Sequence, residues 1–287
     1  IPRDHFKTTL ATRANGLWTV TRDTERTLGI FNENEGKAKS WIGATKNVIQ
    51  ASKLYHTCWP DVLPPGIHYR DKDKGIKVPR NWKWGDTGIM LQRNSHMVAE
   101  LTMEPFGIGG ATAGKHFTHF IKDDIIGDKA AESDAVMNDA IEWLNIARAL
   151  ERPAENGCEL FNFTRWGYYD AYSHALQKWG GQYKLYLRHM LEGPNREPDV
   201  VNGKVIFPTR FRSSQAREMY EQDNFVFMSQ YMNIPMAGRT TSFQANWIRY
   251  GNMHDEHKED PYFRIEDTSF DPDIMHADLQ GTEERPP

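Results

Sequence analysis

The sequence predicts an α/β fold in which a mostly parallel sheet carries helices on both faces. Short β-prone runs alternate with amphipathic helical patterns, which is typical of parallel strands joined by helical crossovers. The β-prone stretch 117–122 ends in two adjacent carboxylates, Asp123 and Asp124, where parallel strands present ligand-binding side chains. Aromatic residues make up 12% of the 287 residues, enough to build a core and to exclude a disordered chain.

The overall composition excludes several classes of protein. A net charge of -4 excludes a globally basic surface, so a nucleic-acid partner would have to meet a local patch or one assembled from several subunits. The two cysteines favour a reducing compartment over a disulfide framework. We find no apolar run of membrane-spanning length and no signal peptide, so we expect a soluble intracellular protein with no membrane contact.

The first part of the chain is predicted to contain two helices, a strand and a hairpin. In order, we expect a helix over 10–20, a strand over 27–32, a turn over 33–36, an amphipathic helix over 38–55, an irregular insertion over 59–84, a hairpin of strands 88–92 and 99–103, and a glycine-rich loop over 107–114. That loop precedes a strand and not a helix, which makes it a poor candidate for binding phosphate.

The second part repeats the strand and helix rhythm. In order, we expect a helix over 134–150, a strand over 159–164, a helix over 171–178, a strand over 183–190 and two helices over 213–223 and 224–232. From residue 254 the chain is charged, contains Pro and is poor in apolar residues, as in a linker. We therefore predict one domain over 1–240 and a linker or tail over 241–287.

The opening residues PRDHFKTT have the chemistry of a phosphate-binding loop. Backbone N–H groups at a helix start hold phosphate oxygens, Lys7 would reach the β- and γ-phosphates, and the Thr8 hydroxyl would bind Mg²⁺. The glycine consensus is not met, because Ile1 and Phe6 stand at its two glycine positions, and the strand expected before such a loop is not in this sequence. An ordinary basic helix start remains the alternative.

The predicted loop and the paired carboxylates are far apart in the sequence. Lys7 and Asp123 can meet only if the helix after the loop and the strand 117–122 share one edge of a sheet. At such an edge one carboxylate would hold Mg²⁺ and the other, Asp124, would orient a water molecule for attack on phosphate. The alternative for the paired acids is a strand end followed by a polar turn.

Five stretches stand in order along the chain: PRDHFKTT, GIGGATAGKHFTHFIKDDII, FNFTRWGYYDAYSHAL, GKVIFPTRF and FMSQYMNIPM. Together they resemble the ordered motifs of the large terminase subunits of tailed double-stranded DNA bacteriophages, which are DNA-packaging ATPases. The resemblance runs from Pro2 to about Trp247. It implies a sheet of the P-loop NTPase type with a C-terminal linker or lid region, and ATP and Mg²⁺ as cofactors.

The resemblance also implies roles for single residues. Asp123 corresponds to the acid that holds Mg²⁺ with Thr8, and Asp124 to the catalytic acid that acts beside Lys7. Lys115 takes the place of an Arg that is a candidate trans-acting finger. Asp4 and Phe6 depart from the family's Pro-Arg-Gly-His-Gly-Lys loop. The implied nucleotide-binding residues are Arg3, Asp4, His5, Phe6, Lys7, Thr8, Thr9 and Thr164, the last within a coupling motif, Thr164-Arg165-Trp166.

The partners that the resemblance implies are double-stranded DNA, a portal protein and a small terminase subunit. It also implies a homo-oligomeric ring, docked on the procapsid in the host cytoplasm. The nuclease domain of such proteins is expected beyond this chain. We therefore interpret the tail acids Asp267, Asp271 and Asp273 as a solvated linker.

The sequence leaves two alternative functions possible, and it allows two interpretations for each of two groups of residues. The chain could be a nucleotide-binding or scaffold module whose ATPase site is degenerate, or a fragment of an unrelated P-loop kinase or nuclease. The basic group Arg210, Arg212 and Arg217 fits a solvated helix face or a contact with DNA phosphate. His254 and His257 offer metal-ligand types, although such spacing in a polar stretch is more often a solvated loop.

Overall fold

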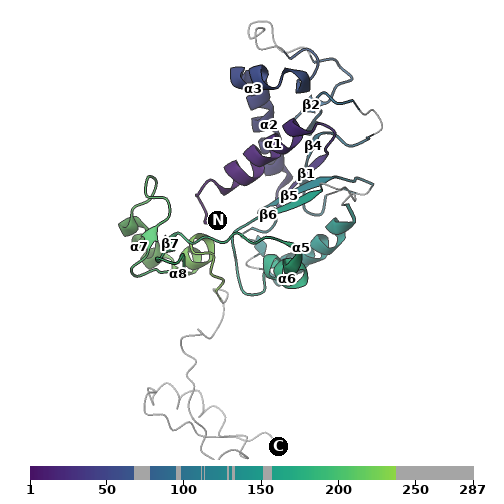
Figure 1. The fold of residues 1–287 in the computed structure, drawn as a ribbon. Coiled ribbons are helices and arrows are strands. Elements are labelled where there is room, and N and C mark those ends of the chain that lie inside the picture. The colour runs from purple at the N-terminus through teal and green to yellow at the C-terminus, as the bar shows by residue number, and fades with distance from the viewer. Residues whose placement is uncertain are drawn as a thin grey trace, which may run out of the picture. The chain divides into compact units, whose positions relative to one another are not determined.

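A six-stranded sheet forms the centre of the structure, a computed structural model (Figure 1). It describes residues 1–67, 78–94, 98–110, 112, 114–127, 129–130, 133–150 and 157–236, all of which belong to one unit, Ile1–Gly238. The strand order is β2-β3-β4-β1-β5-β6. The predicted linker 241–287 lies outside the described residues, and so do His254, His257 and the three tail acids.

Four of the six strands are parallel, which confirms the predicted α/β class. They are β1 (Leu28–Asn32), β4 (Met103–Gly107), β5 (His119–Asp123) and β6 (Cys158–Asn162). β1 pairs with β4 on one side and β5 on the other, and β5 also pairs with β6. The short β2 (Trp84–Gly85) and β3 (Gly88–Ile89) add an antiparallel edge beside β4.

Helices cover both faces of this sheet, and others lie in a body outside it. In chain order they are a π-helix (Thr8–Ala14), α1 (Asn15–Arg22), α2 (Glu35–Ala51), α3 (Lys53–Cys58), α5 (Asp134–Ala147), α6 (Ala171–Trp179), α7 (Ser213–Gln222), α8 (Asn224–Val226) and a second π-helix (Phe227–Tyr231). Short 3-10 turns lie at Pro60–Val62, Arg148–Leu150 and Gly180–Gln182. Within the described residues, none of these helices has the length and apolar character that a membrane crossing needs.

The alternation of side chains along the central strands builds one core on each face. Ile30 and Ile121 belong to a cluster that packs on α1 and α2. Their strand neighbours Phe31 and Phe120 belong to another cluster, which packs on α5 and α6. Every residue of β1 and β5 is buried, as expected for parallel strands covered on both faces.

A third core lies outside the sheet and defines what we call the C-terminal body, residues 188–234. Its buried members are Met190, Leu191, Ala216, Phe227 and Met232. It contains α7, α8, the second π-helix and a two-stranded antiparallel ribbon of β7 (Leu191–Glu192) and β8 (Lys204–Val205). The helices predicted over 213–223 and 224–232 are confirmed.

The predicted strand over 183–190 is wrong. The only strand near it is β7, which begins at Leu191, and residues 183–190 form no ladder in the described structure. The apolar side chains that suggested a buried strand, Leu185, Tyr186 and Leu187, are exposed. Apolar content alone therefore misled the prediction, because this run has no sheet neighbour to bury it.

Two other predicted boundaries shift for local reasons. The helix expected over 38–55 is two helices, because Ser52 adopts an extended backbone and its hydroxyl accepts a hydrogen bond from the Tyr55 N–H at 3.2 Å as a new N-cap. In the predicted hairpin, β4 begins at Met103, where the second strand was expected to end. Between β3 and β4 the chain is held by the Arg93 guanidinium, which donates a hydrogen bond to the Glu100 carbonyl at 2.9 Å.

Candidate functional site

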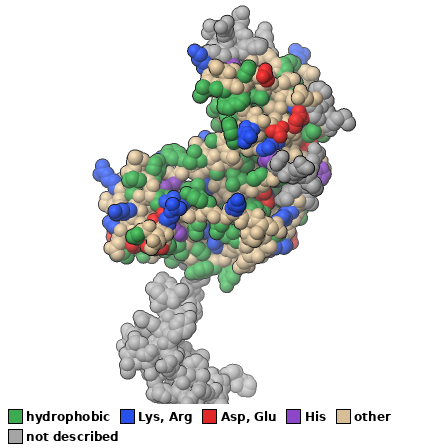
Figure 2. All heavy atoms as spheres, viewed as in Figure 1, with side chains coloured by type: hydrophobic (Ala, Val, Ile, Leu, Met, Phe, Trp, Pro, Cys, Tyr) green, Lys and Arg blue, Asp and Glu red, His purple; other side chains and the backbone are tan. Residues whose placement is uncertain are grey.

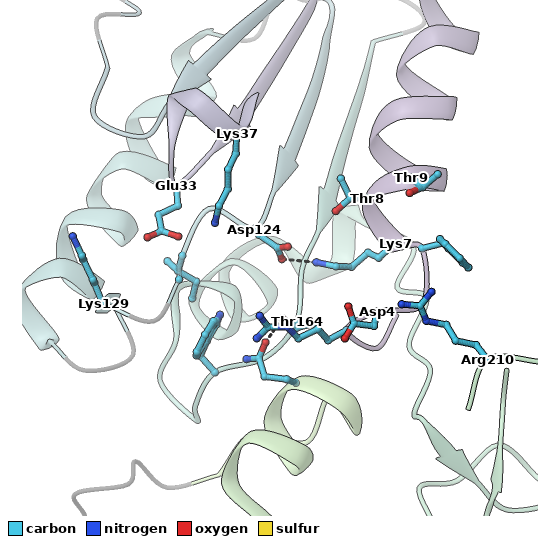
Figure 3. Close-up of a pocket in the computed structure, with 16 residues that line it drawn as sticks. Asp4, Lys7, Thr8, Thr9, Glu33, Lys37, Asp124, Lys129, Thr164 and Arg210 are labelled. Atoms are coloured by element: carbon cyan, nitrogen blue, oxygen red, sulfur yellow. Dashed lines mark hydrogen bonds and ion pairs between the residues drawn. The ribbon is translucent and has the colours of Figure 1, made fainter. Parts of the chain in front are cut away.

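A cavity of about 510 Å³ opens where the first nine residues meet the carboxyl ends of the parallel strands (Figure 3). Its wall includes Lys7 and Thr8 from the start of the first π-helix and Asp124 from the end of β5. Thr164, just beyond β6, and Gln230, from the C-terminal body, complete the opposite side. Parallel α/β sheets bind their ligands at this edge.

The structure brings together the predicted loop lysine and the paired acids. The Lys7 ammonium forms an ion pair with the Asp124 carboxylate, and its Nζ atom lies 3.9 Å from Asp123 Oδ1 (Figure 3). Lys7 is buried, whereas the Asp124 side chain is 40% exposed and lines the cavity. The end of β1 holds this turn in place, because the Asn32 amide donates to the Asp123 carbonyl at 2.6 Å.

Asp123 lies behind the cavity wall in a fully buried network. Its carboxylate accepts hydrogen bonds from Thr12 Oγ1 at 2.7 Å, Asn162 Nδ2 at 2.9 Å and Thr8 Oγ1 at 3.4 Å. Burial raises the pKa of Asp123 to about 6, and repulsion from Asp124 adds to the rise. Attraction to Lys7 and the two threonine hydrogen bonds oppose it. This acid therefore exchanges its proton near neutral pH.

Three residues of the site hold the backbone in the left-handed region. The φ angles are 62° at Asp4, 57° at Phe6 and 46° at Asp124. A residue with a Cβ atom pays about 1–2 kcal/mol for this conformation, and such strain gathers at functional sites. Phe6 stands where the phosphate-loop consensus has a glycine. Glycine suits this position because it adopts a positive φ angle without strain.

Most of the other predicted loop residues line the cavity, and one packs behind it. Arg3, Asp4, Phe6 and Thr9 line the cavity. His5 does not. Its buried ring stacks on Phe211 with centroids 4.9 Å apart, and its Nδ1 lies 2.7 Å from the Arg3 carbonyl oxygen. Burial lowers the pKa of His5, so we interpret the side chain as a neutral support for the loop.

Lys115, a predicted site residue, has its partner away from the cavity. Its ammonium lies 2.7 Å from the Glu104 carboxylate, and it does not line the cavity. The structure therefore does not bring it together with Lys7 and Asp124, and a role across a subunit boundary stays a prediction.

The predicted basic group separates in the structure. Arg210 lines the cavity, with its guanidinium carbon 5.1 Å from the centre of the Phe6 ring. Arg212 is the N-cap residue of α7, and Arg217 donates to the Val201 carbonyl at 3.0 Å. On the face shown in Figure 2, Lys and Arg side chains lie in several separate places among polar and hydrophobic atoms.

Sequence reasoning missed the two residues that position Asp123 and several that line the cavity, among them Glu33, Lys37, Lys129 and Gln230. Thr12 lies one helical turn after Thr8, and Asn162 is the last residue of the strand beside β5, so both had a signal in periodicity and strand position. Gln230 had no signal in the sequence, because it reaches the cavity only through the folding of the C-terminal body.

The donor set around the carboxylates fits Mg²⁺. In the part of the chain that the structure describes, no group of three or more His, Cys, Asp or Glu side chains is arranged to hold a metal ion by itself. Mg²⁺ is usually held by one or two protein oxygens together with phosphate oxygens and water. Thr8 and Asp123 supply such oxygens beside the cavity.

No protein-family model matches this chain, and no curated protein sequence matches it significantly. The site is therefore interpreted from its own geometry.

Proposed function

We propose that this chain is an ATP-hydrolysing motor domain of a viral terminase large subunit, which drives double-stranded DNA into a procapsid. The observation that carries the proposal is the ion pair between Lys7 and Asp124 at the carboxyl edge of the sheet, with Asp123 and Thr8 beside it. A triphosphate needs cations, a Mg²⁺ site and a carboxylate that orients water. Lys7, Thr8 and Asp124 line one cavity, and Asp123 lies directly behind its wall.

In this proposal Lys7 exchanges one partner for another. Its flexible stem lets the ammonium contact either the Asp124 carboxylate or a phosphate oxygen. A triphosphate held by the backbone of the loop competes for the ammonium, with Arg3 adding positive charge from the cavity wall. Asp124, released from the ion pair, is then free to accept a hydrogen bond from the attacking water.

Thr8 and Asp123 would hold Mg²⁺, which supplies positive charge to the phosphates when it is bound. Thr12 and Asn162 keep the Asp123 carboxylate in one orientation. The partners in this proposal are DNA, a portal protein, a small terminase subunit and further copies of the chain in a ring, all of which follow from the resemblance in sequence.

A second candidate is a nucleotide-binding or scaffold module without turnover. The observation in its favour is Phe6, whose strained, 45% exposed side chain lines the cavity at a position where a glycine would let phosphate approach closely. Only the first candidate hydrolyses nucleotide.

Thermal unfolding with and without Mg²⁺-ATPγS tests the site. Ligand at 100-fold excess over Kd should stabilise the wild-type protein by about 2.7 kcal/mol, and Lys7→Ala should abolish the shift. Lys53→Ala, an exposed lysine of α3, is the matched control and should keep it. Equal shifts in the wild type and Lys7→Ala would refute the site.

Turnover then separates the two candidates. In the motor proposal, Asp124→Asn binds Mg²⁺-ATP and hydrolyses it at least ~100-fold more slowly, because an amide orients water poorly. The assay is phosphate release with duplex DNA present. A wild-type protein that binds nucleotide but releases no phosphate would favour the scaffold candidate.

A further inference from the structure

Gln230 joins two parts of the cavity wall that are distant in sequence. It is buried and lines the cavity. Its side-chain oxygen accepts a hydrogen bond from Thr164 Oγ1 at 2.9 Å, and its Nε2 donates to the Arg165 carbonyl at 3.0 Å. Its backbone carbonyl accepts from the Arg3 N–H at 2.9 Å. One residue therefore connects the loop at the chain start with the segment that follows β6.

The next residue holds the loop as well. The Tyr231 hydroxyl donates to Asp4 Oδ2 at 3.2 Å. Consecutive residues of the C-terminal body thus bond to Arg3 and Asp4, which both line the cavity. A ligand that moves this loop must either carry Gln230 and Tyr231 with it or break these bonds.

The helix that carries Gln230 has an uncommon geometry. Residues Phe227–Tyr231 form a π-helix, closed by the Met232 N–H donating to the Phe227 carbonyl at 2.9 Å. Fewer than ~1% of residues in proteins lie in π-helices, which recur at functional sites. The other π-helix, Thr8–Ala14, begins directly after Lys7. Both wide turns border the same cavity.

The π-helix Phe227–Tyr231 is packed into the core of the C-terminal body, so the two should move together. Phe227 opens the π-helix and is buried in the third core, against Tyr220 at 5.7 Å and Tyr231 at 5.9 Å between ring centroids. A displacement of Gln230 therefore displaces an element packed against α7.

We propose that Gln230 is a positioning residue that makes the C-terminal body respond to a phosphate ligand in the cavity. Its side chain acts through the hydrogen bonds with Thr164 and the Arg165 carbonyl, while its backbone carbonyl holds the Arg3 N–H. The inference rests on the proposed function, since the ligand is the nucleotide of that proposal, and it adds the route by which binding reaches residues 188–234.

Hydrogen exchange followed by mass spectrometry tests the inference, with Mg²⁺-ATPγS as the probe. In the wild type, the ligand should slow exchange in peptides that cover 213–232. Gln230→Met keeps the length of the side chain and removes its two side-chain hydrogen bonds, and the backbone bond with Arg3 remains. The variant should therefore bind the probe within ~3-fold of the wild type yet lose most of the slowing, and kcat should fall roughly 10-fold. Gln222→Met, an exposed residue of α7, is the matched control and should behave as the wild type.

Three outcomes are informative. Loss of slowed exchange in Gln230→Met with binding retained supports the inference. Probe binding by the wild type with no change in exchange over 213–232, or the same change in Gln230→Met, refutes it and leaves the proposed function standing. No probe binding by the wild type refutes both.

Thr164→Val removes one of the two side-chain hydrogen bonds of Gln230 from its other end and serves if Gln230→Met does not fold. Thr164→Val should produce a defect in exchange no larger than that of Gln230→Met, and the double variant should be no worse than Gln230→Met. Additive defects would mean that the residues act separately, against the inference.

Discussion

At the scale of single residues, the buried Asp123 carboxyl makes stability depend on pH. Its pKa rises from 3.8 to about 6 on folding, first because of burial. Between these values the native state binds the extra proton, so the contribution of Asp123 to the free energy of unfolding falls as pH rises. The fall is complete above the folded pKa and amounts to roughly 3 kcal/mol.

We expect Asp123→Asn to remove this dependence. Urea unfolding between pH 4 and 7 should show the variant gaining stability relative to the wild type as pH rises through the window from about 4 to about 6. Asp139→Asn, an exposed position of α5, should follow the wild-type profile. A difference between Asp123→Asn and the wild type that is constant over this range would contradict the prediction.

A second residue-scale prediction concerns the strained loop. Phe6 has a φ angle of 57°, which costs a residue with a Cβ atom about 1–2 kcal/mol and glycine little. Phe6→Gly and Phe6→Ala both lose the ring contacts with Phe207 and Arg210, so they differ mainly in this strain. We expect the Gly variant to be more stable than the Ala variant by about 1 kcal/mol in urea unfolding. An Ala variant at least as stable as the Gly variant would show that the loop relaxes.

At the scale of elements, β5 carries a fully buried lysine. Lys122 forms an ion pair with Glu159 of β6, which also accepts a hydrogen bond from the Tyr183 hydroxyl. The Lys122 Nζ lies 4.7 Å from the centre of the Phe161 ring. The ion pair and the ring contact therefore join β5 to β6, and the hydrogen bond from Tyr183 joins β6 to the segment that follows α6.

Removing one charge of this buried pair should cost far more than removing both. Lys122→Met leaves an uncompensated carboxylate in the core and should cost about 3–5 kcal/mol in urea unfolding. Adding Glu159→Gln should recover most of that loss, because no unpaired charge remains. A double variant less stable than Lys122→Met would mean that the carboxylate has other favourable partners that outweigh its burial.

The same elements show what the sequence can and cannot predict. The strands over 27–32 and 159–164 and the helix over 171–178 were predicted correctly, because local periodicity matched their final burial. Lys122 interrupts the apolar pattern of its strand, yet it is buried, because its partner Glu159 comes from a neighbouring strand that periodicity does not reveal. The run 183–190 failed for the opposite reason, because apolar side chains were present without a neighbour to bury them.

The candidate site divides in the same way. Lys7, Thr8 and the paired acids were predictable, because helix starts and strand ends of an α/β sheet meet at one edge. Thr12 and Asn162 were missed, although helical periodicity and strand position carried a signal for both. Gln230 depended on the packing of a body with its own core, which no local pattern encodes.

At the scale of the whole described unit, the sheet with its two cores and the C-terminal body are joined at the cavity. The sheet clusters and the third cluster share no buried residue. The connections at the cavity include the hydrogen bonds of Gln230 and Tyr231. Polar connections between separate cores favour separate opening, because local unfolding units follow the packed clusters.

We therefore expect core truncations to act on the two bodies unequally. Phe227→Ala should destabilise the C-terminal body by about 3–5 kcal/mol, and hydrogen exchange should accelerate over 188–234 while the amides of β5 keep their wild-type rates. Phe120→Ala, an equally buried ring of the sheet, should accelerate exchange in β5 itself. The C-terminal body responds to the cavity only if it can move without unfolding the sheet. Equal acceleration of both bodies in Phe227→Ala would make the unit a single cooperative one, and coupling through Gln230 would then have to act by small displacement within one folded core.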